Sequence, residues 1–357
     1  MRVDVTYYLS GTASSAMDVS GQFKDLVSAL GNRGFKLSST FPTKHLICIN
    51  HNPKAYKEFI RFGGKPENAS LICLEPYAVY PSQYSAKVFE LYAVIHSPGN
   101  PTFKDSSGQF IPWPYEATAN PLKPYDDGLS LRSHVEENAL KGLFSYDNWI
   151  NRKDFVTLIN ANKVSPVKNE NYGLRRVYAR DLPENLLAVY GDLWVSSISK
   201  KIVHRLMVLL FTLKSGHLPR ILNIYGNLHW KFKSARGPLE DKQITLQSSK
   251  FSIIIENDSS YISEKLIDAL INGCVPIYFG PKNIDSIIPK GTYLELSKTP
   301  DELIPMLENL SETEIRNFLS NIQMFVTSEE FTLRWDKKNV FTQLASSIDN
   351  QIRALHE

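Results

Sequence analysis

Short apolar runs alternate with helix-period segments along most of the 357 residues, and this alternation constrains the fold more than any other feature. One set of runs opens with "VDVTYYL", and a second begins near Lys153 with "DFVTLINAN". A stretch with four prolines, residues 111–128, lies between the two sets and predicts a long loop or linker. Alternating strands and helices are typical of βαβ units, which build parallel sheets.

The pattern therefore predicts an α/β protein of two Rossmann-like domains facing a cleft. We expect a first domain over residues 1–150, a second over 151–335, and a closing amphipathic helix over 336–357. A chain of this length accommodates two domains of ordinary size. Because such sheets bind ligands at the carboxyl ends of their strands, the site is expected there.

Composition excludes several classes of function. The chain has 40 Lys and Arg against 37 Asp and Glu, so it lacks the overall positive field that gathers nucleic acid, and no nucleic-acid partner is expected. Cys48, Cys73 and Cys274 lie far apart in apolar runs, which favours buried reduced thiols and a cytoplasmic compartment. No window reaches the roughly 18 apolar residues of a membrane span, and no secretory signal pattern opens the sequence. We expect a soluble or peripheral protein.

Residues 251–280 combine a buried strand, "FSIIIEN", with the head of an amphipathic helix, "YISEKLIDALING". The unpaired N–H groups of a helix N-terminus and its dipole favour an anion such as phosphate. Lys265 would pair with that anion, Glu264 could accept hydrogen bonds from sugar hydroxyls, and Tyr261 could stack or donate. The residues alone leave a second interpretation open, in which a capped surface helix carries a solvated Glu–Lys pair.

This region resembles the donor-binding core of the α-1,3/4-fucosyltransferase family, inverting GT-B enzymes that use GDP-fucose. The resemblance covers about residues 153–330 and is thin in the N-terminal half. The matching elements, in order, are Lys250-Phe251, Glu256-Asn257, Tyr261-x-x-Glu264-Lys265, Gly273-x-x-Pro276, Gly280 and Ile288-Pro289. An earlier block resembles the opening of the same domain, where a strand ends in Asn, an Arg follows, and a second strand ends in Gly. These elements would be Asn162, Arg175 or Arg176, and Gly191.

The resemblance implies roles that the chemistry of sugar transfer requires. Negative charge builds on the departing diphosphate, so cations are needed there, and a carboxylate must take the proton of the acceptor hydroxyl. The resemblance gives the cationic part to Lys265 and to Arg175, or in its place Arg176, with no metal or other cofactor. The donor pocket would be completed by Asn162, Arg176, Glu256, Asn257, Tyr261, Ser263 and Glu264. Ser263 stands where many members of the family have Thr.

The family places its base on an N-terminal loop after a strand, on the acceptor side. Glu75, which follows the apolar run "SLICL" and precedes Pro76, is the best candidate for this base. The alternative is an ordinary carboxylate at a strand end. Glu116, in the proline-rich stretch, is a second candidate that would more readily shape the acceptor cleft.

Residues 196–237 are basic on a strongly apolar helical background. One interpretation is peripheral contact with an anionic membrane, where a lipid-linked glycan acceptor would be found. The other, which we favoured from the sequence, is an insertion helix packed on the domain with solvated lysines. The histidines are scattered without the spacing of metal ligands, so no metal site is predicted.

Together these features predict an inverting glycosyltransferase with two substrates, a nucleotide-sugar donor and a glycan acceptor. By resemblance the donor is GDP-fucose, and the acceptor is a hydroxyl of a surface polysaccharide or lipopolysaccharide-type glycan. A related transferase that uses another nucleotide sugar is one alternative. A two-lobed glycan- or nucleotide-binding protein without catalysis is the other.

Overall fold

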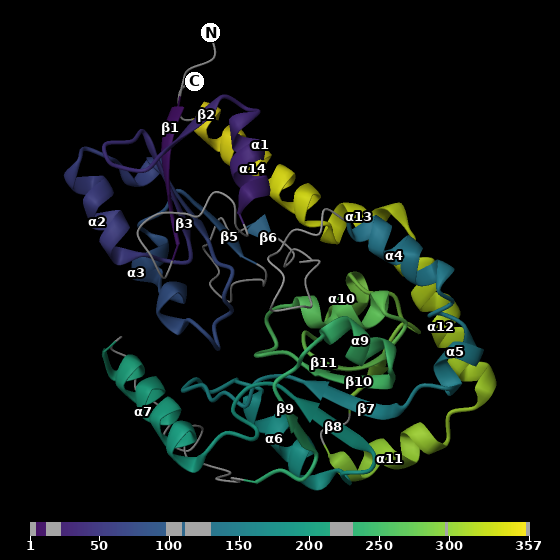
Figure 1. Cartoon of the computed structure of the whole chain (residues 1–357). Coiled ribbons are helices and arrows are strands. Elements are labelled where there is room, and N and C mark those ends of the chain that lie inside the picture. The colour runs from purple at the N-terminus through teal and green to yellow at the C-terminus, as the bar shows by residue number, and fades with distance from the viewer. Residues whose placement is uncertain are drawn as a thin grey trace. The chain divides into compact units, whose positions relative to one another are not determined.

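The computed structural model describes residues 5–11, 23–97, 109–110, 130–214, 231–296 and 299–354. It divides into two compact units (Figure 1). Unit 1 comprises Met1–Glu116 and Leu333–Glu357, and unit 2 comprises Ala117–Thr332. Each unit carries one six-stranded sheet in which the paired strands run parallel.

The sheet of unit 1 has the order β2-β1-β3-β4-β5-β6. Its strands are β1 Val5–Ser10, β2 Phe35–Ser38, β3 His45–Ile49, β4 Ala69–Ile72, β5 Val94–Ser97 and β6 Gln109–Phe110. Every residue of β3 and β4 is buried, as expected for central strands covered on both faces. The helices of this unit are α1 Lys24–Gly31, α2 Pro53–Arg61, α3 Ala86–Phe89 and α14 Lys337–Ala354, with 3₁₀ turns η1 Pro66–Asn68 and η2 Pro81–Tyr84.

The C-terminal helix α14 completes the core of unit 1. It lies beside α1, as Figure 1 shows in yellow and purple. Phe341, Leu344 and Ile348 of α14 are buried in one hydrophobic cluster with Leu26 and Leu30 of α1. The apolar stripe of this helix therefore packs on a unit that lies some 300 residues earlier in the sequence.

The sheet of unit 2 has the order β12-β11-β10-β7-β8-β9. Its strands are β7 Asp154–Ile159, β8 Leu187–Tyr190, β9 Ala235–Gly237, β10 Ser249–Ile255, β11 Val275–Phe279 and β12 Leu294–Glu295. The chain runs outward from β7 to β9 and then returns to pair β10 with β7. The direction of winding reverses at this pair, and Rossmann-like sheets bind ligands beside such a switch point.

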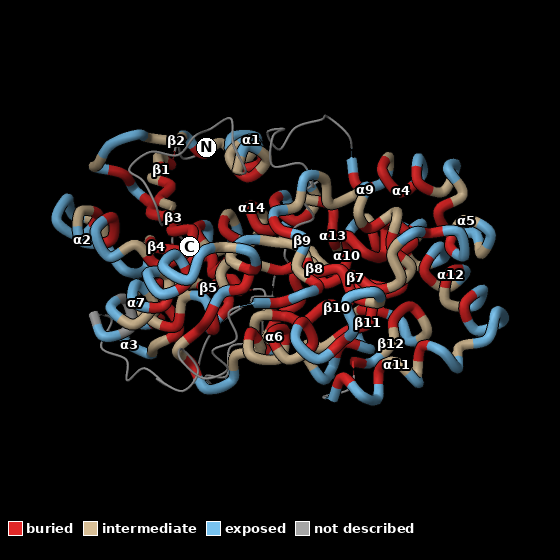
Figure 2. Tube along the Cα trace, turned by 60° about the horizontal axis from the view of Figure 1, so that its bottom comes forward, coloured by how far each residue is buried: buried red, intermediate tan, exposed pale blue. Residues whose placement is uncertain are grey.

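The helices of unit 2 are α4 Leu131–Leu140, α5 Tyr146–Ile150, α6 Tyr172–Asp181, α7 Ile198–Lys214, α9 Lys242–Gln247, α10 Glu264–Ile271, α11 Pro300–Glu308 and α12 Glu312–Val326, with the 3₁₀ turn η3 Ile284–Ser286. Helix α13, Glu329–Trp335, crosses the division between the units. Helices α4 and α5 contact α10, α12 and β10, so they belong to unit 2, whereas the sequence had placed them in a first domain of residues 1–150. Figure 2 shows β7, β10 and α10 among the buried parts of the unit.

Candidate functional site

The carboxyl ends of β7 and β10 lie next to each other at the switch point of unit 2. The two strands pair in parallel, with Ile253 opposite Leu158. Asn162 follows the end of β7, while Glu256 and Asn257 directly follow β10. The structure therefore brings these three predicted residues to one edge of the sheet, where the chain then enters α10.

Glu256 anchors the beginning of α10. Its side chain is fully buried, and Oε1 accepts hydrogen bonds from the backbone N–H of Ser263 at 2.9 Å and from the Tyr278 hydroxyl at 3.3 Å. Burial raises the pKa of Glu256, although the nearby Lys265 ammonium acts in the opposite direction. Glu256 thus fixes the backbone at the N-terminus of α10 through its bond to the Ser263 N–H.

Ser263 caps α10, because its Oγ accepts from the backbone N–H of Lys265 at 3.4 Å. The Lys265 ammonium lies 3.0 Å from Glu264 Oε1, and the two side chains are 21% and 27% exposed. Burial alone would raise the pKa of Glu264, but Lys265 and Lys242 outweigh it and lower that pKa to about 2. The pair is therefore partly buried rather than the solvated surface pair of the alternative interpretation.

Lys242, which begins α9, is a residue that the sequence analysis missed. Its ammonium forms an ion pair with Asp268 and lies 3.9 Å from Glu264 Oε1. Two cations and two carboxylates thus alternate along the start of α10. No pattern in the sequence marks Lys242, since it stands about twenty residues before its partners in a segment of ordinary composition.

Arg175 of α6 shapes the loop between β10 and α10. Its Nε and Nη2 donate to the carbonyl oxygen of Ile255 at 3.1 and 2.5 Å, and Nη2 donates to Asn257 Oδ1 at 2.7 Å. Asn257 Nδ2 in turn donates to the buried Tyr261 hydroxyl at 2.7 Å. The guanidinium also lies 4.6 Å from the centre of the Tyr172 ring. These contacts engage Arg175 with the protein itself.

Arg176, the next residue, is held differently. It is buried, its Nη1 donates to the Lys163 carbonyl oxygen at 2.8 Å, and its Nε has no hydrogen-bond partner within the described part of the chain. Burial lowers the pKa of Arg176 to about 10, opposed by Glu170 and reinforced by Arg205 of α7. Glu170 and the buried Arg205 are further charged groups that the sequence analysis did not single out.

Several buried polar atoms around this edge lack a partner within the ranges that the structure describes. Buried polar groups are normally paired, so such a group of exceptions needs an explanation, and a ligand is one. The atoms are Asn160 Oδ1, Asn162 Oδ1, Asn171 Nδ2, Arg176 Nε, His204 Nε2 and Glu256 Oε2.

Two glycines let backbone segments approach closely in unit 2, Gly191 at the carboxyl ends of the strands and Gly273 at their amino ends. Gly191, after β8, has φ +128°, and a Cβ there would clash with the carbonyl group of Asn160. Gly273, after α10, has φ +62°, and a Cβ would clash with the carbonyl group of Leu143. The buried Arg152 donates to the carbonyl oxygens of Gly273 and Leu143 at 2.8 and 2.7 Å. Both glycines of the predicted motifs thus have a packing reason.

Glu75 belongs to unit 1, whereas all other predicted site residues belong to unit 2. It follows β4, and its backbone N–H donates to Asn50 Oδ1 at 3.0 Å. Its carbonyl oxygen accepts from Gln83 Nε2 and from the Tyr84 hydroxyl, each at 2.8 Å. The main chain of Glu75 is therefore fixed, and its side chain is half-buried. Glu116 lies outside the described residues.

The described residues contain no group of three or more His, Cys, Asp or Glu side chains placed to hold a metal ion. The three cysteines are buried and free of disulfides.

Comparison with known proteins finds a family match for part of the chain. Residues 209–342 match the family described as "Glycosyltransferase family 10 (fucosyltransferase) C-term". These residues carry a fucosyltransferase-family domain. An α-(1,4)-fucosyltransferase of Arabidopsis thaliana is 37% identical over 70 residues, which is 18% of each chain. A putative fucosyltransferase-like protein of the same plant is 30% identical over 91 residues, which is 25% of this chain and 17% of that one. Each match thus spans less than a fifth of the curated relative.

Solved structures show the fold. An α1,3-fucosyltransferase solved with GDP superposes with a TM-score of 0.53 at 14% identity, covering 98% of this chain and 90% of that one. Anabaena HepE, solved with UDP and glucose, superposes with a TM-score of 0.52 at 10% identity, covering 97% of this chain and 99% of that one. The predicted GT-B class, with two Rossmann-like domains, is confirmed, and so is the fucosyltransferase resemblance of the C-terminal half.

Proposed function

We propose that this chain is an inverting glycosyltransferase that moves L-fucose from GDP-fucose to a hydroxyl group of a glycan. One observation carries the proposal. In a fucosyltransferase-family domain, the N-terminus of α10 with Lys265 lies at the same sheet edge as buried polar atoms of Arg176 and Asn162 that have no partner in the described residues. Such an edge suits a nucleoside diphosphate.

The donor would displace the existing ion pair at α10. Because the pKa of Glu264 is about 2, its carboxylate is ionised at neutral pH and can only accept hydrogen bonds. Ribose hydroxyls donating to Glu264 would take over part of its interaction with Lys265. The Lys265 ammonium could then turn to the diphosphate, beside the backbone N–H groups of the helix.

Arg175 and Arg176 would have different roles in donor binding. Arg175 holds Asn257 and the Ile255 carbonyl, so it would position the loop that borders the donor. Arg176 has a buried Nε without a partner in the described residues, so it would donate to a phosphate oxygen. The sequence leaves open which of the two arginines contacts phosphate, and this proposal gives that contact to Arg176.

In the reaction, the oxygen of the acceptor hydroxyl forms a bond to C1 of fucose as the bond from C1 to the diphosphate oxygen breaks. The electron pair of the broken bond leaves with GDP, where Lys265 and Arg176 neutralise the growing charge. The acceptor proton passes to the Glu75 carboxylate. A single displacement inverts the configuration at C1. These cations supply the charge stabilisation, so the proposal includes no metal or other cofactor.

We place the enzyme in the cytoplasm, at the inner face of a membrane, with a surface polysaccharide or lipopolysaccharide-type glycan as its acceptor. The three free, buried cysteines support a reducing compartment. Residues 196–237 would supply the membrane contact.

The runner-up donor is another nucleotide sugar. The polar groups at the switch point of unit 2 suit the ribose and the phosphates, which all such donors share, and none of them selects fucose. A non-catalytic protein that binds a nucleotide or glycan is the remaining alternative.

Thermal shift tests the proposal, because a ligand that binds only the folded protein raises the melting temperature. We expect GDP to raise it and GDP-fucose to raise it further, with no response to UDP or CMP. Lys265→Ala should lose the GDP response. The matched control is Lys290→Ala, which should keep it. A response to another nucleotide alone would replace the donor, and a response to none would overturn the proposal. A non-catalytic protein would bind GDP-fucose but release no GDP with any glycan acceptor.

A further inference from the structure

Helix α7 (Figure 1) exposes a broad set of apolar side chains. Met207 and Leu210 are each 64% exposed, and the rest of the surface is between 41% and 54% exposed. The spacing by three, four and five residues places these side chains on one half of the helix. We call this surface the α7 apolar face, and it consists of Ile198, Ile202, Val203, Leu206, Met207, Leu210 and Leu213.

The opposite side of α7 is cationic and points inward. Lys201 and Arg205 are buried, with only 4% of each exposed. Lys201 Nζ donates to the Trp194 carbonyl oxygen at 2.8 Å and lies 5.9 Å from the centre of the Phe232 ring. The Phe232 ring packs edge-on against Trp194, with ring centres 4.9 Å apart. These contacts fix the rotation of the helix about its axis.

This arrangement is the reverse of a helix adapted to water, which buries its apolar side chains and exposes its charges. From the sequence we expect a packed helix with solvated lysines; Lys200 is exposed in this way, whereas Lys201 and Arg205 are buried. An exposed apolar surface of this extent usually marks an interaction site.

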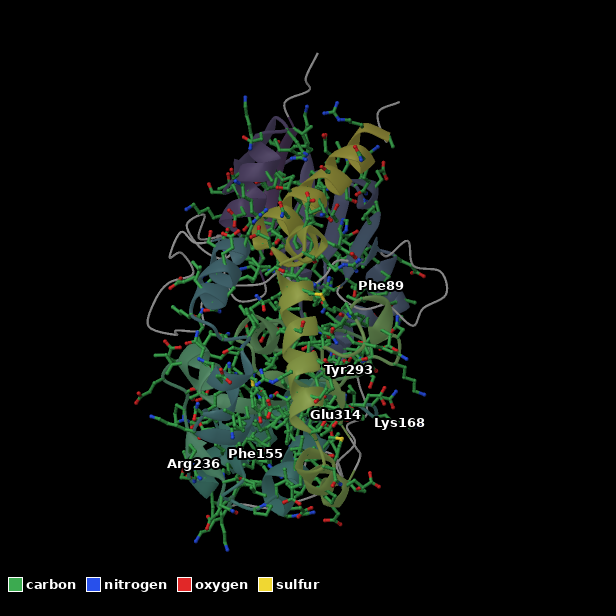
Figure 3. All side chains as sticks on the ribbon, turned by 90° about the vertical axis from the view of Figure 1, so that its right-hand side faces the viewer. Phe89, Phe155, Lys168, Arg236, Tyr293 and Glu314 are labelled. Carbon is green, nitrogen blue, oxygen red and sulfur yellow. The ribbon has the colours of Figure 1, made fainter. Side chains whose placement is uncertain are left out.

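Charge indicates what covers the face. Lys200, Lys231, Lys233 and Arg236 are exposed, and no Asp or Glu occurs anywhere in residues 196–237. Lys231 and Lys233 flank Phe232, which contacts the first half of α7. Figure 3 shows Arg236 at the outside of unit 2. An exposed apolar surface accompanied by exposed cations of the same acid-free segment complements a lipid surface with anionic headgroups.

We infer that the α7 apolar face enters the acyl-chain boundary of an anionic membrane, with Lys200, Lys231 and Lys233 at the headgroup phosphates. Among the described residues no helix is both long and apolar enough to cross a bilayer, so α7 would lie in the plane of the surface. A second copy of the chain is a poorer occupant, because it would bring the same cationic border against itself. The inference deepens the proposed function and rests on it in one respect, that the acceptor is a lipid-linked glycan.

Vesicle co-sedimentation of the full chain tests the inference without any donor or acceptor. We expect binding to vesicles of phosphatidylcholine and phosphatidylglycerol, weak binding to phosphatidylcholine alone, and loss of binding at high salt. The double variant Met207→Gln/Leu210→Gln should bind at least about tenfold more weakly, since two large apolar contacts are lost. The matched control is Met324→Gln/Leu140→Gln, which changes the same residue types at 63% and 90% exposure and should bind like the wild type.

The cationic border has its own variants. Lys231→Gln/Lys233→Gln should weaken binding to anionic vesicles by about fivefold for each charge removed, and leave binding to neutral vesicles unchanged. Lys54→Gln/Lys57→Gln on α2 removes two exposed charges from unit 1 and serves as the control.

Four results would overturn the inference. Wild-type protein could fail to bind anionic vesicles, or Met207→Gln/Leu210→Gln could bind as tightly as the wild type. The same variant could melt several degrees lower without vesicles, which would mean that another part of the chain covers the face. A dimer seen by light scattering and abolished by that variant would instead assign the face to a second copy. The thermal shift with GDP, measured on every variant, separates these outcomes from a failure of the proposed function.

Discussion

The two units share one architecture but keep different chemistry inside it. At the switch point of unit 2, Arg175, Arg176 and Glu256 are buried as ionisable groups around the strand ends. Unit 1 instead buries His45 and His96 within its sheet, and burial lowers the pKa of each ring, to about 3 and about 4. A parallel sheet therefore does not by itself make a site. Charged groups have to be held at its edge, and only unit 2 shows a group of them among the described residues.

Among the variants that test this contrast, Lys265→Ala has the largest expected effect on activity. Removing the cation at the α10 N-terminus should lower transfer with any nucleotide sugar by about 10³-fold, the order of effect of one electrostatic contact in a transition state. The measurement is GDP release with a glycan acceptor. Lys290→Ala, an exposed lysine of unit 2, is the control. If Lys265→Ala kept a tenth of the activity, the charged edge of unit 2 would not be the donor site.

Glu75→Gln asks whether unit 1 contributes chemistry at all. We expect transfer to fall by about 10²-fold or more, since a general base is lost, while the thermal shift with GDP stays unchanged. Glutamine has the size and shape of glutamate, so the main-chain contacts of Glu75 should stay in place in the variant. Glu67→Gln, an exposed carboxylate of the same unit, is the control. Unchanged transfer in Glu75→Gln would show that Glu75 is not the general base. Unit 1 would then contribute only to substrate binding.

The sequence predicted the charged edge of unit 2 because its residues have structural work as well as chemistry. Glu256 must hold the Ser263 N–H, and Gly191 must admit the Asn160 carbonyl. Because such requirements allow only a few residue types, and at fixed spacing, they leave a motif that can be recognised in the sequence. The alternation of strands and helices predicted both sheets for a similar reason, since burial on two faces demands apolar runs.

Other features could not be predicted from the sequence. Lys242, Glu170 and Arg205 reach the site by folding from separate segments, and nothing local in the sequence distinguishes them from solvated charges. The sequence leaves the outward face of α7 open between two interpretations, because periodicity gives the faces of a helix but does not say which one points inward. The burial of Lys201 and Arg205 decides which face points inward, and this burial depends on tertiary structure.

Exchanging each of the two arginines for lysine sharpens the comparison inside unit 2. Arg175→Lys should lower the melting temperature by several degrees, because lysine cannot replace the forked bonds to Ile255 and Asn257. Arg176→Lys should weaken GDP binding by about tenfold, with a smaller effect on melting. Calorimetric titration with GDP and thermal melting measure the two effects. The reverse result would return the phosphate contact to Arg175.

Lowering the pH should also distinguish the two units, through its effect on their stability. His45, His51 and His96 of unit 1 have pKa values lowered by burial to about 3, 4 and 4, so the fold holds each ring neutral. The unfolded chain binds protons at these rings near pH 6.5. Their contribution to stability is therefore complete above pH 6.5 and is lost progressively as the pH falls towards 4.

Glu256 of unit 2 should respond in the opposite sense. The pKa of Glu256 is raised by burial, so the fold binds its proton more readily than the unfolded chain does, and acid favours the folded state there. Glu264 keeps its depressed pKa of about 2 and loses stabilising effect only below about pH 4.5. Hydrogen exchange at pH 7.5 and 5.5 should show β3 and β4 losing protection more than β7 and β10. His96→Leu removes one titrating ring and should reduce the acid loss in unit 1, whereas equal losses in both units would show that buried histidines do not set the difference.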